Sequence, residues 1–217
     1  MTFTTIDPAR TAPPRELPEI QRYTLFDRIV HWEVGVTFVY LLLTGIALAY
    51  PRMAWLQTML GGGQTVRAAH PWVGVAFTLG ILAMLFAWAR SMRGEKTDRE
   101  WLRRLRTYVN TGHTGVDVGK FNPGQKGYYW FSIVFSVVLF ASGIPLWFPG
   151  TFGGHQAARL IHHVAYLLML AGFIVHVYMS TVMLPGTMSA MTSGKVTRRW
   201  AAWHHPRWFR EKTGSTE

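Results

Sequence analysis

The 217-residue sequence contains no cysteine, few acidic residues and little charge overall. The absence of cysteine excludes disulfides, thiolate zinc sites and cysteine-ligated iron–sulfur clusters within this chain. Charged residues make up 15% of the sequence, against roughly a quarter in soluble domains, whereas 49% of the residues are hydrophobic. This balance is typical of a membrane protein with polar loops and tails.

Four long apolar stretches dominate the chain, and no internal repeat stands out. A bilayer core about 30 Å thick requires roughly 20 mostly apolar residues in each spanning helix. The stretches cover residues 31–50, 72–89, 128–148 and 160–184, and each is followed at once by a proline or an arginine. We therefore predict an all-α membrane protein, a four-transmembrane-helix bundle.

The basic residues are divided unevenly between the segments outside these stretches. Nineteen of the 22 lysines and arginines lie in the N-terminal tail, the middle segment 90–126 and the C-terminal tail. By the positive-inside rule, this distribution places both termini and the middle segment in the cytoplasm. The net charge of +11 then faces anionic lipid headgroups. Its division into short blocks near the membrane argues against a nucleic-acid partner.

The chain accordingly divides into three parts. We expect an N-terminal cytoplasmic tail over 1–21, a four-helix membrane domain over 22–194 and a cytoplasmic C-terminal tail over 195–217. The first 20 residues contain acids, four prolines and no apolar run, so no signal peptide is expected. In the middle segment, the residues WLRRLRTYV favour a short amphipathic helix on the membrane surface.

Four of the nine histidines, His31, His70, His162 and His176, lie in or at the ends of the predicted spans. An ionisable residue there is functional by default, because a polar group in hydrocarbon is unfavourable without a partner. His70 and His162 lie near one membrane face, and His31 and His176 lie nearer the other. Each pair comes from two helices at matching depth, which is the arrangement that a haem iron with two histidine ligands requires.

Helical phase selects His162 over its neighbour His163. Fourteen residues separate His162 from His176, so their side chains lie within about 40° of each other around the helix axis. A helix that contributes one ligand to each of two haems should present both on one face. His163 then points to a loop, a haem propionate or a neighbouring chain.

Glycines near the four histidines support the same interpretation. Gly35, Gly74 and Gly172 each stand four residues from a predicted ligand, where a glycine leaves room for a flat macrocycle. Close packing between membrane helices is the alternative role of such glycines. The loop and tail histidines are predicted to be solvated: His113, His155, His204 and His205.

A metal-dependent hydrolase is the competing chemistry. The sequence has no HExxH motif, and the predicted spans contain one carboxylate, Glu33, near an edge. Two histidines on each iron leave no open coordination position, which favours electron transfer. A small transporter or structural membrane protein without haem is a further alternative, for which the matched histidines would be a coincidence.

The segment KFNPGQK, residues 120–126, directly precedes the third span. Its Asn-Pro-Gly sequence predicts a turn that breaks any helix before the span begins. A turn at the membrane interface exposes backbone N–H groups and an amide, which suit the carbonyl oxygens of a quinone. An ordinary loop that enters a helix is the alternative.

Five segments together resemble a known family. They are FDRIVHW, RAAHPW, VGKFNPGQK, IVHVYM and the tail GKVTRRWAAWHHPRWFREK, and they extend over roughly residues 22 to 212. The sequence resembles the gamma subunit of membrane-bound, quinone-linked formate dehydrogenases, among the bacterial di-haem cytochromes b that also serve nickel–iron hydrogenases. The tail favours the formate dehydrogenase branch, and the cytochrome b of a nickel–iron hydrogenase is the alternative.

The resemblance implies a multi-pass subunit of the bacterial inner membrane that takes part in anaerobic respiration. A molybdenum or tungsten alpha subunit oxidises formate, and an iron–sulfur beta subunit passes the electrons to this chain. The family also implies a trimer of such heterotrimers.

The resemblance also implies the cofactors. One haem b, on His70 and His162, receives the electrons, and a second, on His31 and His176, passes them to menaquinone or ubiquinone near the cytoplasmic face. The family's quinone site corresponds to Asn122 and Gly124, with His176 close by.

Overall fold

The computed structural model describes residues 18–150 and 155–214. Its elements in chain order are β1 (Glu19–Gln21), α1 (Leu25–Ala49), the 3-10 turn η2 (Pro51–Met53), α2 (Trp55–Met59), α3 (Gly63–Trp88), α4 (Lys96–Arg103), α5 (Leu105–Thr111), α6 (Pro123–Trp147), α7 (His155–Tyr178), the π-helical turn η3 (Met179–Met183), α8 (Ser189–Thr192), β2 (Lys195–Thr197), α9 (Arg198–His204) and α10 (Pro206–Thr213).

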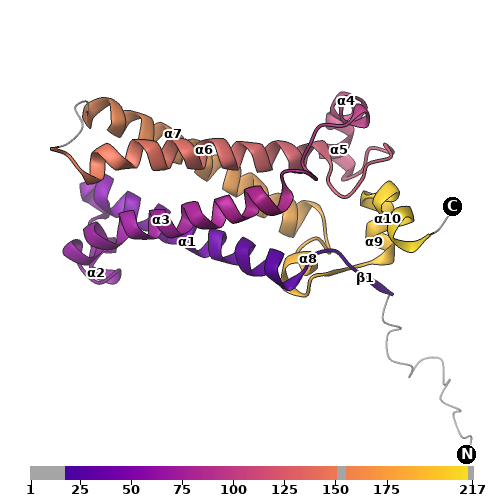
Figure 1. Cartoon of the computed structure of the whole chain (residues 1–217), viewed down its shortest axis with the longest axis horizontal. Helices are drawn as coiled ribbons and strands as arrows, with labels where there is room; N and C mark the ends of the chain where they lie inside the picture. Colours follow the sequence, from indigo (N-terminus) through magenta and orange to yellow (C-terminus); the bar gives the residue numbers. More distant parts are fainter. Residues whose placement is uncertain (1–17, 151–154, 215–217) are drawn as a thin grey trace, which may run out of the picture.

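Four long helices, α1, α3, α6 and α7, form a bundle, and each is long and apolar enough to cross a membrane (Figure 1). α1 packs mainly on α3, and α6 packs mainly on α7, while α3 and α6 join the two helix pairs. Among the described residues, α7 packs on neither α1 nor α3 to a comparable extent. Large apolar side chains lie exposed along all four helices, as lipid contact requires. The predicted four-helix membrane architecture is confirmed, with one short β1–β2 pair added.

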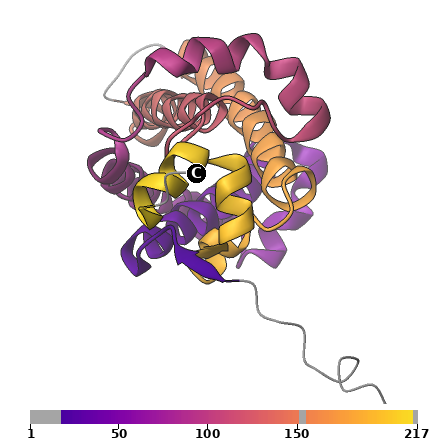
Figure 2. The ribbon, with the colours of Figure 1, turned by 90° about the vertical axis from the view of Figure 1, so that its right-hand side faces the viewer.

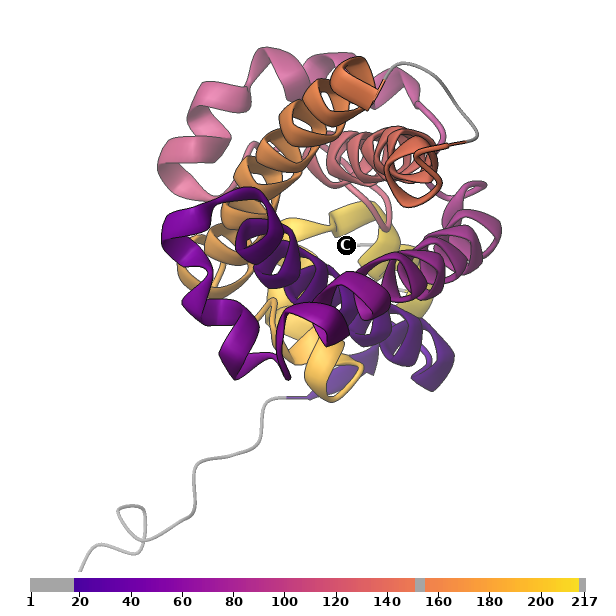
Figure 3. The same cartoon turned by 90° about the vertical axis from the view of Figure 1, so that its left-hand side faces the viewer.

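The two ends of the bundle differ. One end, called here the terminal end, carries β1, α4, α5 and α8 to α10, and the described chain both begins and ends there (Figure 1). The other, called the α2 end, carries α2 and the start of α3 (Figure 3). Because four spans return the chain to its starting side, both ends of the described chain lie at the terminal end. The assignment of this end to the cytoplasm stays a prediction.

All four long helices begin before the apolar stretches that predicted them. α1 begins at Leu25 because a capping box precedes it: Asp27 N–H donates to Thr24 Oγ1 at 3.2 Å, and Thr24 N–H donates to the Asp27 carboxylate at 2.9 Å. Such polar capping residues fall outside an apolar window. Hydropathy therefore underestimates the length of each helix at its start.

The predicted turn at KFNPGQK is wrong. Residues 123–126 form the first turn of α6, and Asn122 is its N-terminal cap. Asn122 Oδ1 accepts from Gln125 N–H at 3.0 Å, and Gln125 Oε1 accepts from Asn122 N–H at 3.0 Å. Pro123 takes the first helical position, where a missing N–H leaves nothing unsatisfied. The Asn-Pro-Gly sequence therefore starts a helix here.

The residues WLRRLRTYV form parts of two helices, and the single amphipathic helix predicted for them is wrong. α4 and α5 meet at Arg104, and Arg104 Nη1 donates to the carbonyl of Thr114 at 3.0 Å. Trp101 is buried against Tyr108, with ring centroids 4.7 Å apart. This segment packs against its own chain and forms a small hydrophobic cluster at the terminal end.

The C-terminal segment folds across the terminal end of the bundle (Figure 2). β2 pairs with β1 in antiparallel register, with Val196 opposite Ile20, and α9 and α10 bury Trp200 and Trp208. Trp200 and Trp208 share one hydrophobic cluster with Tyr23 and Trp88, so the C-terminal segment packs on the part of the chain predicted as the membrane domain.

The prediction that His205 is solvated is wrong, because its side chain is only 1% exposed. His205 Nδ1 donates to the carbonyl of Gly119 at 2.9 Å, and Arg22 Nη2 donates to His205 Nε2 at 3.1 Å. Burial, together with the neighbouring charge of Arg22, holds the pKa of His205 well below its usual value. Burial also lowers the pKa of the adjacent His204 to about 4.

Candidate haem sites

The four histidines of the spans lie in two facing pairs. His70 on α3 faces His162 on α7, with ring centroids 6.5 Å apart. His31 on α1 faces His176 near the end of α7, with ring centroids 6.0 Å apart. The structure thus brings together the residues that depth and helical phase group from the sequence. Ligation of iron by these residues stays a prediction.

The spacing within each pair suits an iron atom. An iron about 2 Å from each of two imidazole nitrogens, as in other metal–histidine bonds, places the ring centroids roughly 6 Å apart. The observed values of 6.0 and 6.5 Å agree with this spacing. In the described part of the chain, no cluster of three or more His, Cys, Asp or Glu could hold a bare metal ion. Two facing imidazoles fit haem, because the macrocycle itself supplies the remaining iron ligands.

A hydroxyl on a neighbouring helix holds each ring of the His70–His162 pair. Thr44 Oγ1 on α1 lies 2.7 Å from His70 Nδ1, and Ser142 Oγ on α6 lies 3.0 Å from His162 Nδ1. Both hydroxyl residues are buried, with Thr44 at 0% and Ser142 at 7% exposure. The two rings of this pair are therefore held in the same way, one in each helix pair.

The direction of these hydrogen bonds follows from the backbone. Thr44 Oγ1 donates to the carbonyl of Tyr40 at 2.8 Å, and Ser142 Oγ donates to the carbonyl of Val138 at 2.6 Å. A hydroxyl has one proton, so toward the imidazole each oxygen can only accept. With the hydroxyls donating to their own helices, His70 and His162 carry their proton on Nδ1. The other ring nitrogen, Nε2, keeps a lone pair for a metal.

The His31–His176 pair has a different environment. His31 Nδ1 is buried and has no hydrogen-bond partner among the described residues. The His176 ring stacks on Tyr128 of α6, with centroids 4.7 Å apart and planes 6° from parallel. Trp32 meets His31 edge-on at 5.6 Å. Aromatic side chains therefore pack on the His31–His176 pair, whereas hydroxyls hold the rings of the His70–His162 pair.

The glycines divide between two roles. A Cβ on Gly172 would lie 2.7 Å from Phe131 Cε1, so this glycine permits close packing of α7 on α6, the alternative role. A Cβ on Gly35 would meet nothing within 4 Å, which leaves space beside His31. Gly45 and Gly143 were not predicted, yet a Cβ on either would lie 3.6 Å from the nearest predicted ligand ring.

His163 belongs to neither pair. Its Nδ1 donates to the carbonyl of Arg159 at 2.8 Å, and its ring lies near Tyr50 and Tyr166, with centroids 6.4 and 5.8 Å away. The two tyrosine hydroxyls bond to each other at 2.7 Å. The structure therefore separates His163 from His162, as the phase argument predicts.

Two of the residues predicted to bind quinone lie at the start of α6. Asn122 is buried: its Oδ1 caps the helix, and its Nδ2 donates to Tyr108 Oη at 3.4 Å. Gly124 is exposed and borders the Trp101 ring. The amide of Asn122 is thus already engaged within the chain.

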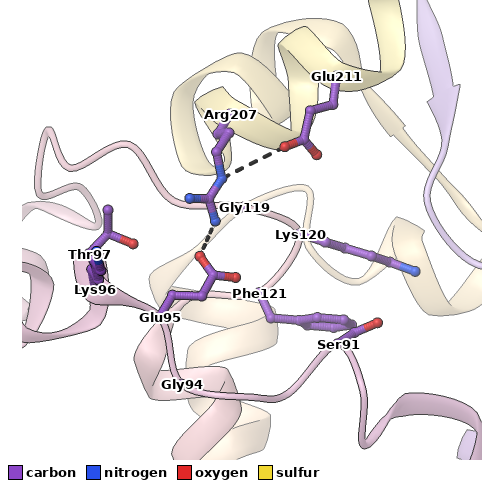
Figure 4. Close-up of a pocket in the computed structure, with 10 residues that line it drawn as sticks. All are labelled: Ser91, Gly94, Glu95, Lys96, Thr97, Gly119, Lys120, Phe121, Arg207 and Glu211. Carbon is purple, nitrogen blue, oxygen red and sulfur yellow. Dashed lines mark hydrogen bonds and ion pairs between the residues drawn. The ribbon is translucent and has the colours of Figure 1, made fainter.

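A cleft of about 710 Å³ opens beside this segment (Figure 4). Arg207 points into it and pairs with Glu95 and with Glu211, the latter at 3.8 Å. The remaining lining residues include Lys96, Lys120 and Phe121. Paired charges of both signs suit a solvated cleft better than the apolar ring of a quinone.

A short repeat in the sequence marks the hydroxyls that hold His70 and His162. Residues 44–51 read TGIALAYP, and residues 142–149 read SGIPLWFP. Gly, Ile, Leu and Pro recur at the same positions, and the first residue carries a hydroxyl in both. This repeat was the available signal for Thr44 and Ser142, and the prediction that the sequence has no repeat overlooked it.

The sequence matches one family model and several named relatives. The model of "prokaryotic cytochrome b561" matches residues 22–194. The cytochrome b556(fdo) subunit of formate dehydrogenase from Escherichia coli strain K12 is 33% identical over 203 residues, covering 91% of this chain and 95% of that protein. The nitrate-inducible cytochrome b556(Fdn) subunit of the same strain is 33% identical over 198 residues, covering 88% and 91%.

A third relative comes from another genus. The formate dehydrogenase cytochrome b556 subunit of Haemophilus influenzae strain Rd is 35% identical over 193 residues, covering 85% of this chain and 80% of that protein. These relatives favour the formate dehydrogenase branch over the hydrogenase branch. The chain belongs to the prokaryotic cytochrome b561 family, among the cytochrome b556 subunits of formate dehydrogenases.

Proposed function

We propose that this chain binds two b-type haems and carries electrons through the membrane from an iron–sulfur subunit to a quinone. The observation that carries the proposal is the presence of two facing histidine pairs at opposite ends of the bundle, with centroid separations of 6.0 and 6.5 Å. Each pair joins α7 to a helix on which it packs little.

The chemistry that haem supplies here is one-electron transfer, because two imidazole ligands leave the iron no open position for substrate. The chain's part is to hold the two sites apart in a fixed relation. His162 and His176 stand fourteen residues apart on one helix, which is about 21 Å along its axis. α7 thus ties both sites to one rigid element.

Quinone is reduced, in this proposal, at the terminal end of the bundle near the start of α6. Tyr128, stacked on His176, is six residues beyond Asn122, about 9 Å along the helix. The exposed backbone at Gly124 and the ring of His176 border the quinone, and Asn122 holds the start of α6 in place. Menaquinone and ubiquinone both fit this description.

We propose that the terminal end of the bundle faces the cytoplasm. The described residues of the segments at that end include seventeen lysines and arginines, which is the bias that the positive-inside rule describes. The chain would lie in the bacterial inner membrane and assemble with an iron–sulfur beta subunit and a molybdenum or tungsten alpha subunit. A trimer of these heterotrimers is the expected assembly, in contact with membrane lipid.

The test is haem content per chain, with the reduced-minus-oxidised optical spectrum, in the purified complex. Wild-type protein should contain two b-type haems per chain. His70→Ala and His162→Ala should each retain only the haem of the His31–His176 site, whereas His31→Ala and His176→Ala should retain only the other.

His163→Ala is the matched control, since this histidine adjoins a predicted ligand but faces away from the pair. It should retain both haems. A folded wild-type protein without haem would refute the proposal, and full haem content in any of the four ligand variants would refute that residue's assignment.

A further inference from the structure

The repeat at residues 44–51 and 142–149 places a hydroxyl residue followed by glycine beside each ring of one histidine pair. We propose that these two hydroxyl–glycine steps, Thr44–Gly45 and Ser142–Gly143, are the positioning elements of the His70–His162 haem site. The inference rests on the proposed function, which makes both histidines iron ligands. It assigns a role to four residues that do not touch the iron themselves.

The hydroxyl of each step sets the tautomer and the orientation of its ring. Because Thr44 and Ser142 donate to their own helices, they accept from Nδ1–H of His70 and His162. The bond fixes the rotation of each imidazole and directs Nε2 to the space between the rings. It also makes each imidazole a stronger electron donor to a metal.

The glycine of each step lets the ring come close to the backbone of the neighbouring helix. A Cβ on Gly45 would lie 3.6 Å from His70 Cε1, and a Cβ on Gly143 would lie 3.6 Å from His162 Cε1. That distance is ordinary van der Waals contact, so the ring lies directly against the position of each glycine. The hydroxyl of the residue before each glycine lies within bonding distance of the same ring.

Bonds from hydroxyls to the preceding turn are common in this bundle and do not by themselves mark a site. Thr37 Oγ1, for example, donates to the carbonyl of Glu33 at 2.7 Å and lies 3.2 Å from that of Val34. Thr44 makes the same backbone contacts and, in addition, bonds to a histidine ring. Thr37 therefore provides a control on the same helix that makes the same backbone bonds and lacks the bond to a histidine ring.

The hydroxyls should also set an order of redox potentials. Stronger donation by hydrogen-bonded imidazoles stabilises the oxidised iron and lowers the midpoint potential. His31 Nδ1 has no such partner among the described residues. The His70–His162 site is then the lower-potential site, and electrons entering there move downhill to the His31–His176 site.

The experiment is a potentiometric titration of both haems in the purified complex. The Thr44→Val, Ser142→Ala double variant should shift the lower midpoint to a more positive potential and leave the higher one unchanged. Thr44→Ser, which keeps the hydroxyl, should retain the wild-type midpoint. Thr37→Val should shift neither.

The low-spin electron paramagnetic resonance signal is the second readout, because it reports the orientation of the two axial rings. It should change for one haem in the double variant and stay unchanged in Thr44→Ser. If the double variant assembles poorly, Thr44→Val and Ser142→Ala are measured singly, and each should give part of the shift.

Two results would overturn the inference and leave the proposed function standing. One is a double variant with two haems and both midpoints unchanged. The other is a Thr44→Ser variant as perturbed as Thr44→Val, which would trace the effect to side-chain volume. Failure of the proposed function has a separate signature, namely wild-type protein with fewer than two haems per chain.

Discussion

The two histidine pairs of this bundle are held by different forces. A hydrogen bond to a buried hydroxyl orients each of the rings of His70 and His162, and this motif occurs once in each helix pair. His31 and His176 share no such motif in the described chain: the buried Nδ1 of His31 has no hydrogen-bond partner there, and the ring of His176 stacks on Tyr128. Depth and helical phase suffice to bring two rings together, but the neighbouring helices decide how each ring is oriented.

This difference separates the two sites experimentally. One site depends on hydrogen bonds between helices that already pack closely, α1 with α3 and α6 with α7. The His31–His176 site depends on aromatic packing and on the position of α1 at the terminal end. Changes in packing at the terminal end should therefore affect the His31–His176 site and leave the hydroxyl-held site unchanged.

The largest effect should come from filling Gly80, where α3 approaches α1 near His31. A Cβ there would overlap the Glu33 carboxyl group and lie 2.7 Å from Val34 Cγ2. Glu33 can rotate away, but the β-branched Val34 cannot, so α1 must move. Because overpacking costs about 1–3 kcal/mol, Gly80→Ala should lower thermal stability and disturb one haem spectrum.

The affected spectrum should be that of the His31–His176 haem, identified by comparison with the His31→Ala variant. Gly127→Ala is the control, since a Cβ there would meet nothing within 4 Å. Equal disturbance of both haems by Gly80→Ala would show that the two sites are not independent in packing.

The next effect distinguishes two roles of Asn122 at the terminal end. Loss of a helix cap costs about 0.5–2 kcal/mol, whereas serine replaces asparagine as a cap with little loss. If Asn122 acts through the cap, Asn122→Ala should lose stability and quinone reduction together, while Asn122→Ser keeps both. The measurements are thermal unfolding and the rate of quinone reduction by the complex.

A different pattern would support direct contact between Asn122 and the quinone. In that case Asn122→Ser would keep its stability and still lose quinone reduction. Asn122 is 4% exposed and its amide bonds to Tyr108, which favours the first pattern.

Much of the membrane core could be predicted because its physics is local. Four apolar stretches fix four helices, and the regular geometry of a helix places His162 and His176 on one face. The cap residues Thr24 and Asn122 were missed as helix starts, since polar residues before a proline or an apolar run also fit a loop. Local patterns therefore located the spans better than their ends.

The features that were predicted wrongly or missed depend on contacts between residues far apart in sequence. His205 lies in a charged tail, and its burial requires Arg22 and Gly119, which are far away in sequence. The hydroxyls of Thr44 and Ser142 look like ordinary helix residues until the histidines of the next helix are placed. Only the repeated Gly-Ile step could have revealed them from the sequence.

The smallest effect should come from Tyr128, whose ring stacks on His176 at 4.7 Å. A stacked aromatic pair contributes about 0.5–1.5 kcal/mol beyond its buried area. Tyr128→Leu should therefore leave the His176 ring less fixed in orientation and alter the electron paramagnetic resonance signal of the His31–His176 haem. Tyr128→Phe should keep both the stack and the signal. A change in the other haem's signal would contradict the separation of the sites.

Combining Tyr128→Leu with Thr44→Val gives the sharpest form of the comparison. The two sites lie about 21 Å apart along α7, and substitutions more than roughly 10 Å apart with no shared partners usually add. The shifts in the two midpoint potentials should then equal those of the single variants. A combined shift that departs from the sum would mean that α7 transmits the orientation of one ring to the other, so that the two sites act as one unit.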